Sequence, residues 1–312
     1  MSEQHKNELG QPIGAPLPNW SLRPLPPRTP IEGRYSRVEP LEPARHAADL
    51  FAANSNDAEG RNWAYLPYGP FASFDLYREF LEAAARRDDP LVHVIVDRAS
   101  GWAVGVASLM RIDPAAGVIE VGGINYSPRL QRRPAATEAM YLLMRRVFNE
   151  LGYRRYEWKC DSFNAPSRSA AQRIGFRYEG LFRQAAVYKG RNRDTAWFSI
   201  LDSEWPALRS AFERWLDPAN FDSAGRQRAT LQSLHAPEPD GRTPDGSDRV
   251  RYLLAVRAAE SGTGVPAGRS GKAAVVALGD VAQRGGIGIE MRIDKADRVG
   301  LGRIDPGDQP GP

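Results

Sequence analysis

Residues 118–151 read VIEVGGINYSPRLQRRPAATEAMYLLMRRVFNEL, and this stretch predicts a strand, a turn and a long helix in succession. Residues 118–126 are mostly apolar and β-branched, which predicts a strand. From Pro134 onward the apolar residues recur at helical spacing. The turn between the strand and the helix carries Arg132 and Arg133. A strand that leads through a tight turn into a helix offers free amides and the positive end of the helix dipole, so this corner is predicted to bind an anion such as a diphosphate.

Further strands and helices are predicted on both sides of this stretch. Hydrophobic periodicity predicts strands at 35–41, 91–96, 102–110, 155–160, 176–182 and 195–201, and helices at 44–53, 74–86, 165–174 and from about 203. Runs of strands with interleaved helices predict an α/β (α+β) domain over residues 35–220.

The two flanks of this domain have a different composition. Residues 1–34 contain seven prolines, which remove backbone donors and favour extended conformations, so a flexible leader is predicted there. Residues 221–312 are rich in Gly, Pro, Arg and Asp and carry few aromatic residues. A mostly disordered tail is therefore predicted from residue 221.

Composition excludes several classes of protein. The chain has 312 residues, of which 42% are hydrophobic and 26% charged, as expected of a globular protein. No run approaches the roughly 18 apolar residues that span a bilayer, so a cytoplasmic protein without a membrane partner is predicted. The net charge of +4 is too small to indicate a nucleic-acid partner. A single cysteine, Cys160, and four scattered histidines predict no disulfide and no metal site.

Several short motifs resemble those of one family. The segment 131–137, QRRPAAT, resembles motif A of the GNAT acetyltransferases. Residues 164–167 and 173–176 resemble the N-x-x-S and R-x-G-F pattern of the GNAT branch that includes ribosomal-protein N-terminal acetyltransferases, and 189–197 resembles a segment of that branch. The resemblance covers about residues 35–216. It implies the GNAT fold, a mixed, mostly antiparallel central sheet with a splayed strand pair and helices on both faces.

The resemblance also implies acetyl-CoA as co-substrate, with no metal. Beside the pantetheine arm, the expected contacts are Ile124, Asn125 and Tyr126. At the diphosphate, they are Gln131, Arg132, Arg133 and the amides of Ala135, Ala136 and Thr137. Asn164 is expected either to cap its helix or to contact pantetheine. Pro134 stands where the family usually has glycine, and it cannot donate to a phosphate. Its fixed φ nevertheless suits the first turn of a helix.

Two residues are candidates for proton transfer. An attacking amine must lose its proton, and Glu120, a few residues before the corner, is the predicted base. Asp161 and Glu179 are weaker rivals. The leaving thiolate needs a donor, and Ala171 stands where many family members have tyrosine. Ser167, one turn earlier, is the predicted donor, with helix capping as the alternative interpretation.

An aromatic segment is the candidate for acceptor selection. Trp63, Tyr65 and Tyr68 are predicted to form one wall of an acceptor pocket, with the packing of helices onto the sheet as the alternative. The acceptor is predicted to be a small-molecule amine or a peptide N-terminus, and the protein a monomer or a homodimer.

The predicted function is N-acetyl transfer by direct attack in a ternary complex. The runner-up is a catalytically weak, coenzyme-binding regulatory module, which the replacements at Pro134 and Ala171 motivate. A third hypothesis, RNA binding through 189–193 and the basic tail, is less favoured because acidic residues are interspersed there.

Overall fold

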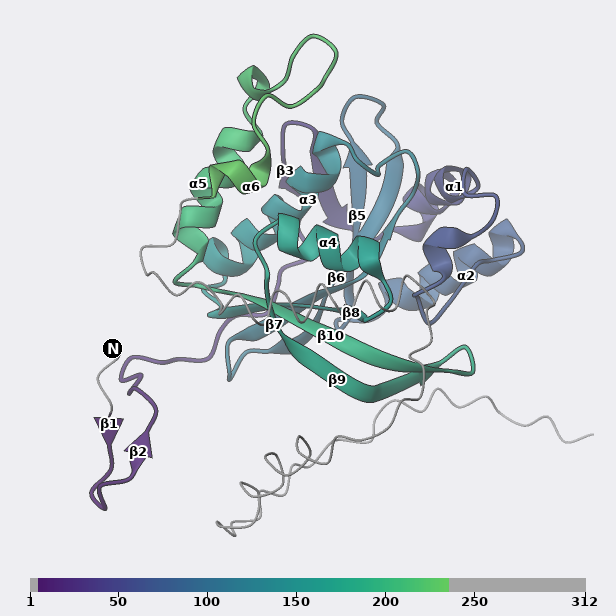
Figure 1. The fold of residues 1–312 in the computed structure, drawn as a ribbon. Coiled ribbons are helices and arrows are strands. Elements are labelled where there is room, and N and C mark those ends of the chain that lie inside the picture. Colours follow the sequence, from purple (N-terminus) through teal and green to yellow (C-terminus); the bar gives the residue numbers. More distant parts are fainter. Residues whose placement is uncertain (1–4, 236–312) are drawn as a thin grey trace, which may run out of the picture. The chain divides into compact units, whose positions relative to one another are not determined.

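The computed structural model describes residues 5–235, so most of the predicted tail, 236–312, lies outside the described residues. Its centre is an eight-stranded sheet with the order β3-β4-β5-β6-β7-β8-β10-β9 (Figure 1). The strands are β3 (Ile31–Glu32), β4 (Ser36–Pro40), β5 (Leu91–Asp97), β6 (Ala103–Asp113), β7 (Val118–Tyr126), β8 (Arg155–Asp161), β9 (Arg177–Tyr188) and β10 (Arg191–Leu201). A separate pair, β1 (His5–Lys6) and β2 (Pro12–Ile13), precedes them.

Six α-helices and three shorter helical turns complete the described part. The helices are α1 (Pro43–Asn54), α2 (Phe74–Ala85), α3 (Pro134–Arg145), α4 (Ala165–Arg173), α5 (Trp205–Trp215) and α6 (Leu231–Leu234). The turns are η1 (Arg61–Trp63), η2 (Arg146–Glu150), a π-helical turn that prolongs α3, and η3 (Pro218–Asn220).

The sheet is interrupted between β7 and β8. Every other pair of neighbours is antiparallel, whereas these two strands run parallel and pair only from Val118↔Arg155 to Val121↔Trp158. Beyond Val121 the two strands continue without pairing to each other. The predicted fold, a mixed and mostly antiparallel sheet with one splayed pair, is therefore confirmed.

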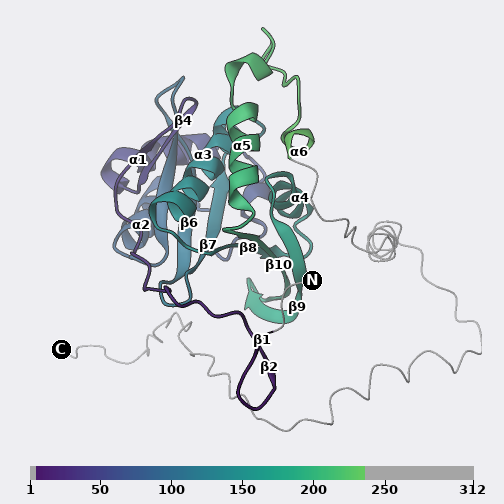
Figure 2. The ribbon, with the colours of Figure 1, turned by 90° about the vertical axis from the view of Figure 1, so that its left-hand side faces the viewer.

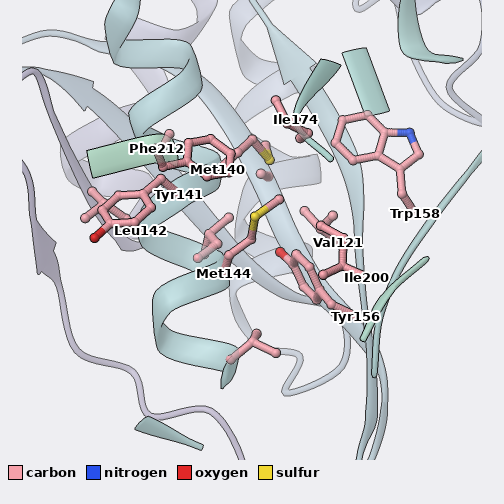
Figure 3. Packing of buried hydrophobic residues seen from close by; sticks show 14 of the residues in the cluster. Val121, Met140, Tyr141, Leu142, Met144, Tyr156, Trp158, Ile174, Ile200 and Phe212 are labelled. Carbon is pink, nitrogen blue, oxygen red and sulfur yellow. The ribbon is translucent and has the colours of Figure 1, made fainter. Parts of the chain in front are cut away.

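Helices cover both faces of the sheet. Alternate strand residues belong to two cores, as the two-residue period of a strand requires: Ile95 packs in the larger core, and Val94 packs in the smaller one. The larger core lies beneath α3, α4 and α5, and the smaller one beneath α1 and α2 (Figure 2). Figure 3 shows Met140 and Met144 of α3 beside Val121 and Tyr156 of the sheet.

One buried carboxylate ties α3 to the edge of the sheet. Glu138 accepts hydrogen bonds from the backbone amides of Arg34, Tyr35 and Ser36, at 2.6 to 2.7 Å, and from the Ser36 hydroxyl. A Cβ at Gly33 would lie 2.5 Å from Glu138 Oε2, so the turn between β3 and β4 needs glycine there. The direction of α3 is thus fixed by more than apolar packing.

The packed part of the chain extends beyond the predicted domain at both ends. Within the predicted leader, the Trp20 indole donates to the Ala115 carbonyl at 2.7 Å, and Arg146 Nη1 donates to the Thr29 carbonyl at 2.6 Å. Leu231 of α6 is only 1% exposed and belongs to the larger core. Residues 20–32 and 221–235 therefore pack against the domain, whereas the prediction ended the folded part at 35 and 220.

Candidate active site

A cleft of about 970 Å³ opens where β7 and β8 separate and where α3 and α4 begin. Most residues predicted as site residues line it: Tyr65, Ile124, Asn125, Tyr126, Gln131, Arg132, Arg133, Ala136, Thr137, Asn164 and Ser167. Four others, Trp63, Tyr68, Glu120 and Ala135, do not line it. The structure therefore brings together residues from four separate segments of the chain.

The start of α3 forms an electropositive corner of this cleft. Arg132 and Arg133 are exposed, and neither has a carboxylate partner in the described part of the chain. The Ala135 and Thr137 amides make no hydrogen bond within residues 5–235, whereas the Ala136 amide donates to the Arg133 carbonyl at 3.1 Å. Of the predicted amide donors, Ala136 is thus already engaged. The corner can hold an anion through the Thr137 amide, which lines the cleft, the helix dipole and two guanidinium groups.

Arg173 is a cleft residue that sequence reasoning did not single out. Its Nη2 donates to Thr137 Oγ1 at 2.8 Å and so links the end of α4 to the start of α3. No carboxylate pairs with it among the described residues, and burial lowers its pKa. The R-x-G-F motif contained this arginine, but only the fold brings it opposite the corner. A third guanidinium is therefore available to an anion there.

Asn125 is buried without hydrogen bonds in the gap between the two strands. It is 2% exposed, it lines the cleft, and neither atom of its carboxamide has a partner within the described chain. β7 carries a bulge just before it, because Ser108 pairs with Gly122 but Val106 pairs with Asn125. Gly123 has a φ of +56° in this bulge, a conformation that favours glycine. An unsatisfied buried amide is costly, so this position suits a polar ligand.

The carbonyl of Tyr126 is already occupied. It accepts from Gln131 Nε2 at 2.8 Å and from Asn62 Nδ2 at 3.3 Å. Gln131 also donates to Asn62 Oδ1 at 2.9 Å, so the three residues close one side of the cleft. Gln131 thus links the turn before α3 to η1.

Ser167 lies in the first turn of α4, and its hydroxyl oxygen accepts one hydrogen bond. Trp158 Nε1 donates to Ser167 Oγ at 3.0 Å, and both residues line the cleft. Because the oxygen accepts this bond, the hydroxyl keeps its own proton as a donor, and Cys160 is one acceptor within its reach. Asn164 Oδ1 accepts from the Ser167 amide at 3.1 Å, which makes Asn164 the helix cap. Its side-chain NH₂ group remains available to a ligand.

Glu120 lies outside the cleft lining and takes part in an ion-pair network. It is 2% exposed, and its carboxylate lies 2.9 Å from Arg111 Nη1 and 2.9 Å from Lys159 Nζ. Lys159 also pairs with Glu157 at 2.8 Å. Glu120 thus has two cationic partners, Arg111 and Lys159. Its assignment as the base remains a prediction.

The two rival carboxylates are also engaged. Asp161 Oδ2 accepts from the Tyr188 hydroxyl at 2.8 Å, and burial, with this carboxylate beside it, raises the pKa of Tyr188 to about 12. Glu179 accepts from Arg155 and from the Ser199 hydroxyl. Asp161 is the last residue of β8, whereas Glu179 lies on the outer strand β9.

The aromatic segment divides between packing and the cleft. Trp63 is buried, and the Tyr68 ring packs on Phe80 with centroids 4.5 Å apart. Burial also raises the pKa of Tyr68 to about 12. Tyr65 lines the cleft, and its hydroxyl donates to the Phe163 carbonyl at 3.1 Å. The packing interpretation therefore describes Trp63 and Tyr68, and only Tyr65 reaches the cleft.

The described residues, 5–235, bear on metal binding and on membrane crossing. In this range no three His, Cys, Asp or Glu side chains gather in a way that could hold a metal ion. None of the helices described there is long and apolar enough to cross a bilayer.

Comparisons with known proteins agree with this geometry. The profile of the acetyltransferase (GNAT) domain matches residues 37–177. A GCN5-related N-acetyltransferase from Brucella melitensis is 54% identical, with a TM-score of 0.69, and the match covers 70% of this chain and 99% of that one. A Bacillus subtilis protein provisionally named ribosomal N-acetyltransferase YdaF is 28% identical over 53% of this chain and 90% of its own length. The uncharacterized N-acetyltransferase YnaD of the same species is 29% identical over 28% of this chain, and only half of its length is matched.

Proposed function

This chain belongs to the GNAT family of acetyltransferases, and from that premise we propose that it transfers an acetyl group from acetyl-CoA to a primary amine. One observation carries the proposal: the gap between β7 and β8 and the electropositive start of α3 open into the same cleft. An acyl donor with a long polar arm and a diphosphate fits that combination. The bound thioester would supply an activated acyl carbon beside the gap.

The residues of the corner would hold the diphosphate. The free amide of Thr137 and the guanidinium groups of Arg132, Arg133 and Arg173 belong to residues that line the cleft there. Pro134 removes one donor from this turn, but these groups remain. Since charge-assisted hydrogen bonds are about twice as strong as neutral ones, the arginines compensate for the missing amide.

Direct attack by the amine is favoured over a covalent enzyme intermediate. Cys160 is buried, and burial raises the pKa of its thiol, so little thiolate forms at neutral pH. The amine would have to arrive neutral or lose its proton in the complex, because an ammonium has no lone pair. We assign that task to Glu120, with water carrying the proton, since the carboxylate lies outside the cleft lining.

Ser167 is assigned as the proton donor to the departing thiolate. Ser167→Ala is expected to lower kcat about tenfold, with little change in the KM for acetyl-CoA, because one donor to a developing negative charge is lost. Ser169→Ala is the matched control, since Ser169 also lines the cleft from α4. Equal kcat values for the two variants would contradict the assignment.

Asn125 is expected to lower the stability of the unliganded protein and to contribute to ligand binding. Asn125→Leu should raise the free energy of unfolding of the unliganded protein by about 1 kcal/mol, because two unpaired buried polar atoms are removed. The same change should lower kcat/KM at least about tenfold. Denaturant unfolding and steady-state kinetics measure the two effects. A variant that is less stable and fully active would show that Asn125 has no ligand role.

The acceptor is proposed to be a small amine or a peptide N-terminus. The name of the YdaF relative points to ribosomal proteins as acceptors for that protein, and this supports including N-terminal peptides here. The test is release of the coenzyme thiol from acetyl-CoA in the presence of amines and short peptides. Thiol release that depends on one acceptor supports an enzyme. Tight binding of acetyl-CoA without release for any acceptor would instead support the regulatory module.

A further inference from the structure

A loop that follows α5 forms part of the cleft wall. Phe221 to Gln227 lie beyond residues 37–177, the range that the family profile matches. Phe221, Gly225, Arg226 and Gln227 nevertheless line the cleft, together with Trp215 of α5. Met140 of α3 and Ile174 after α4 line it as well, so the cleft continues past the first turn of α3.

The loop is held closed by its own hydrogen bonds. Asp222 Oδ1 accepts from the amides of Ala224 and Arg226, both at 2.9 Å, and the Asp222 amide donates to the Arg226 carbonyl at 3.0 Å. Gly225 takes a φ of +74° at the tip. The Phe221 and Gln227 backbones pair across its base. Such a loop presents its side chains in a fixed arrangement before any ligand binds.

The loop is also fixed to α5. The Trp215 indole donates to Gln227 Oε1 at 2.8 Å, and the Phe221 ring meets the Trp215 ring edge to face at 5.3 Å. The side chain of Asn220 bonds the Trp215 and Ala229 carbonyls at 3.0 and 3.2 Å. The lining side chains of the loop are therefore positioned relative to α3 as well, because α5 packs on that helix.

The guanidinium group of Arg226 is oriented so that it can bind a phosphate. Its Nε donates to Asp222 Oδ2 at 2.8 Å, which orients the guanidinium, and its two terminal nitrogens have no partner in the described chain. Two parallel N–H donors of this kind match a phosphate group geometrically. The nearby Phe221 ring offers apolar contact and the Gln227 carboxamide offers a hydrogen-bonding partner, as a nucleobase requires.

We infer that the loop Phe221–Gln227 binds the nucleotide end of the acyl donor, with Arg226 on a phosphate monoester attached to the ribose. The inference rests on the proposed function, which assigns the diphosphate to the start of α3. Beyond its diphosphate, coenzyme A carries an adenosine with a 3′-phosphate. The part of the cleft past Thr137 and Met140 is where that group has room, and the loop is its wall.

Comparison of coenzyme A with dephospho-coenzyme A, which lacks only the 3′-phosphate, tests the inference by calorimetric titration. The unaltered protein is expected to bind coenzyme A at least about tenfold more tightly than the dephospho form, as loss of a charge-assisted contact implies. Arg226→Ala should lose about tenfold in affinity for coenzyme A and nothing for the dephospho form. Arg228→Ala is the matched control, because Arg228 is exposed on the same segment and does not line the cleft.

The outcomes separate this inference from the proposed function. If the unaltered protein binds coenzyme A and its dephospho form equally, and Arg226→Ala changes neither affinity, the inference is overturned while the proposed function stands. If the unaltered protein binds neither compound, the proposed function fails. Equal losses in the Arg226 and Arg228 variants would show a general effect of surface charge and would also overturn the inference.

Discussion

Ala136→Asp is expected to lower the affinity for coenzyme A at least about 100-fold while the protein stays folded. Ala136 is the third residue of α3 and lines the cleft at the corner assigned to the diphosphate. A carboxylate there would face a bound phosphate at close range, and two like charges about 4 Å apart repel by roughly 4 kcal/mol near a protein surface. The same carboxylate favours the helix, since negative charge near a helix N-terminus is stabilising.

The matched control is Ala136→Asn, which has nearly the same size and no charge. Its loss of affinity is expected to be much smaller than that of the aspartate variant. Thermal unfolding should show both variants at least close to the unaltered protein in stability. If both variants bind coenzyme A as tightly as the unaltered protein, the start of α3 does not hold the diphosphate.

Glu120→Gln is expected to lower kcat about 100-fold with little change in the KM for acetyl-CoA. Loss of a general base typically costs between 10²- and 10⁴-fold in rate. The pH–rate profiles of the unaltered enzyme and the variant are compared to test this role. A variant whose pH–rate profile matches that of the unaltered enzyme would remove Glu120 from the mechanism.

Glu157→Gln is the matched control for this prediction. Glu157 pairs directly with Glu120 in the strand register and also binds Lys159, so its replacement disturbs the same ion-pair network. Lys159 keeps one carboxylate partner in either variant. A network effect would lower kcat equally in both variants, whereas a base at Glu120 predicts a loss in the Glu120 variant alone.

The bounds of the central elements could be predicted from the sequence more accurately than the packing of the terminal segments. The predicted strand 118–126 has the same bounds as β7, and the predicted helix from Pro134 is α3 with its π-helical extension. Both depend on local periodicity, which one segment carries by itself. The packing of residues 20–32 depends on partners far along the chain, such as Arg146 for Thr29. The prolines in residues 20–32 do not indicate the contact between Thr29 and Arg146.

The candidate site shows the same limit. The corner at Arg132 and Arg133 was predicted from one continuous segment, and both residues line the cleft beside the start of α3. The guanidinium groups of Arg173 and Arg226 could not be assigned, because their approach to the cleft depends on the packing of α4 and of the loop after α5. Likewise, the ion pairs of Glu120 depend on the pairing of β7 with β6 and β8, the strands that carry Arg111 and Lys159.

The early end of pairing between β7 and β8 has a consequence for the free energy of ligand binding. After Val121 and Trp158 these strands share no hydrogen bonds, so a linear ligand can enter the sheet without breaking any main-chain pairing. The enthalpic cost of leaving these two strands unpaired thus arises during folding and does not recur in each catalytic cycle. Entry and exit of the substrate can then be rapid without any melting of the scaffold that surrounds it.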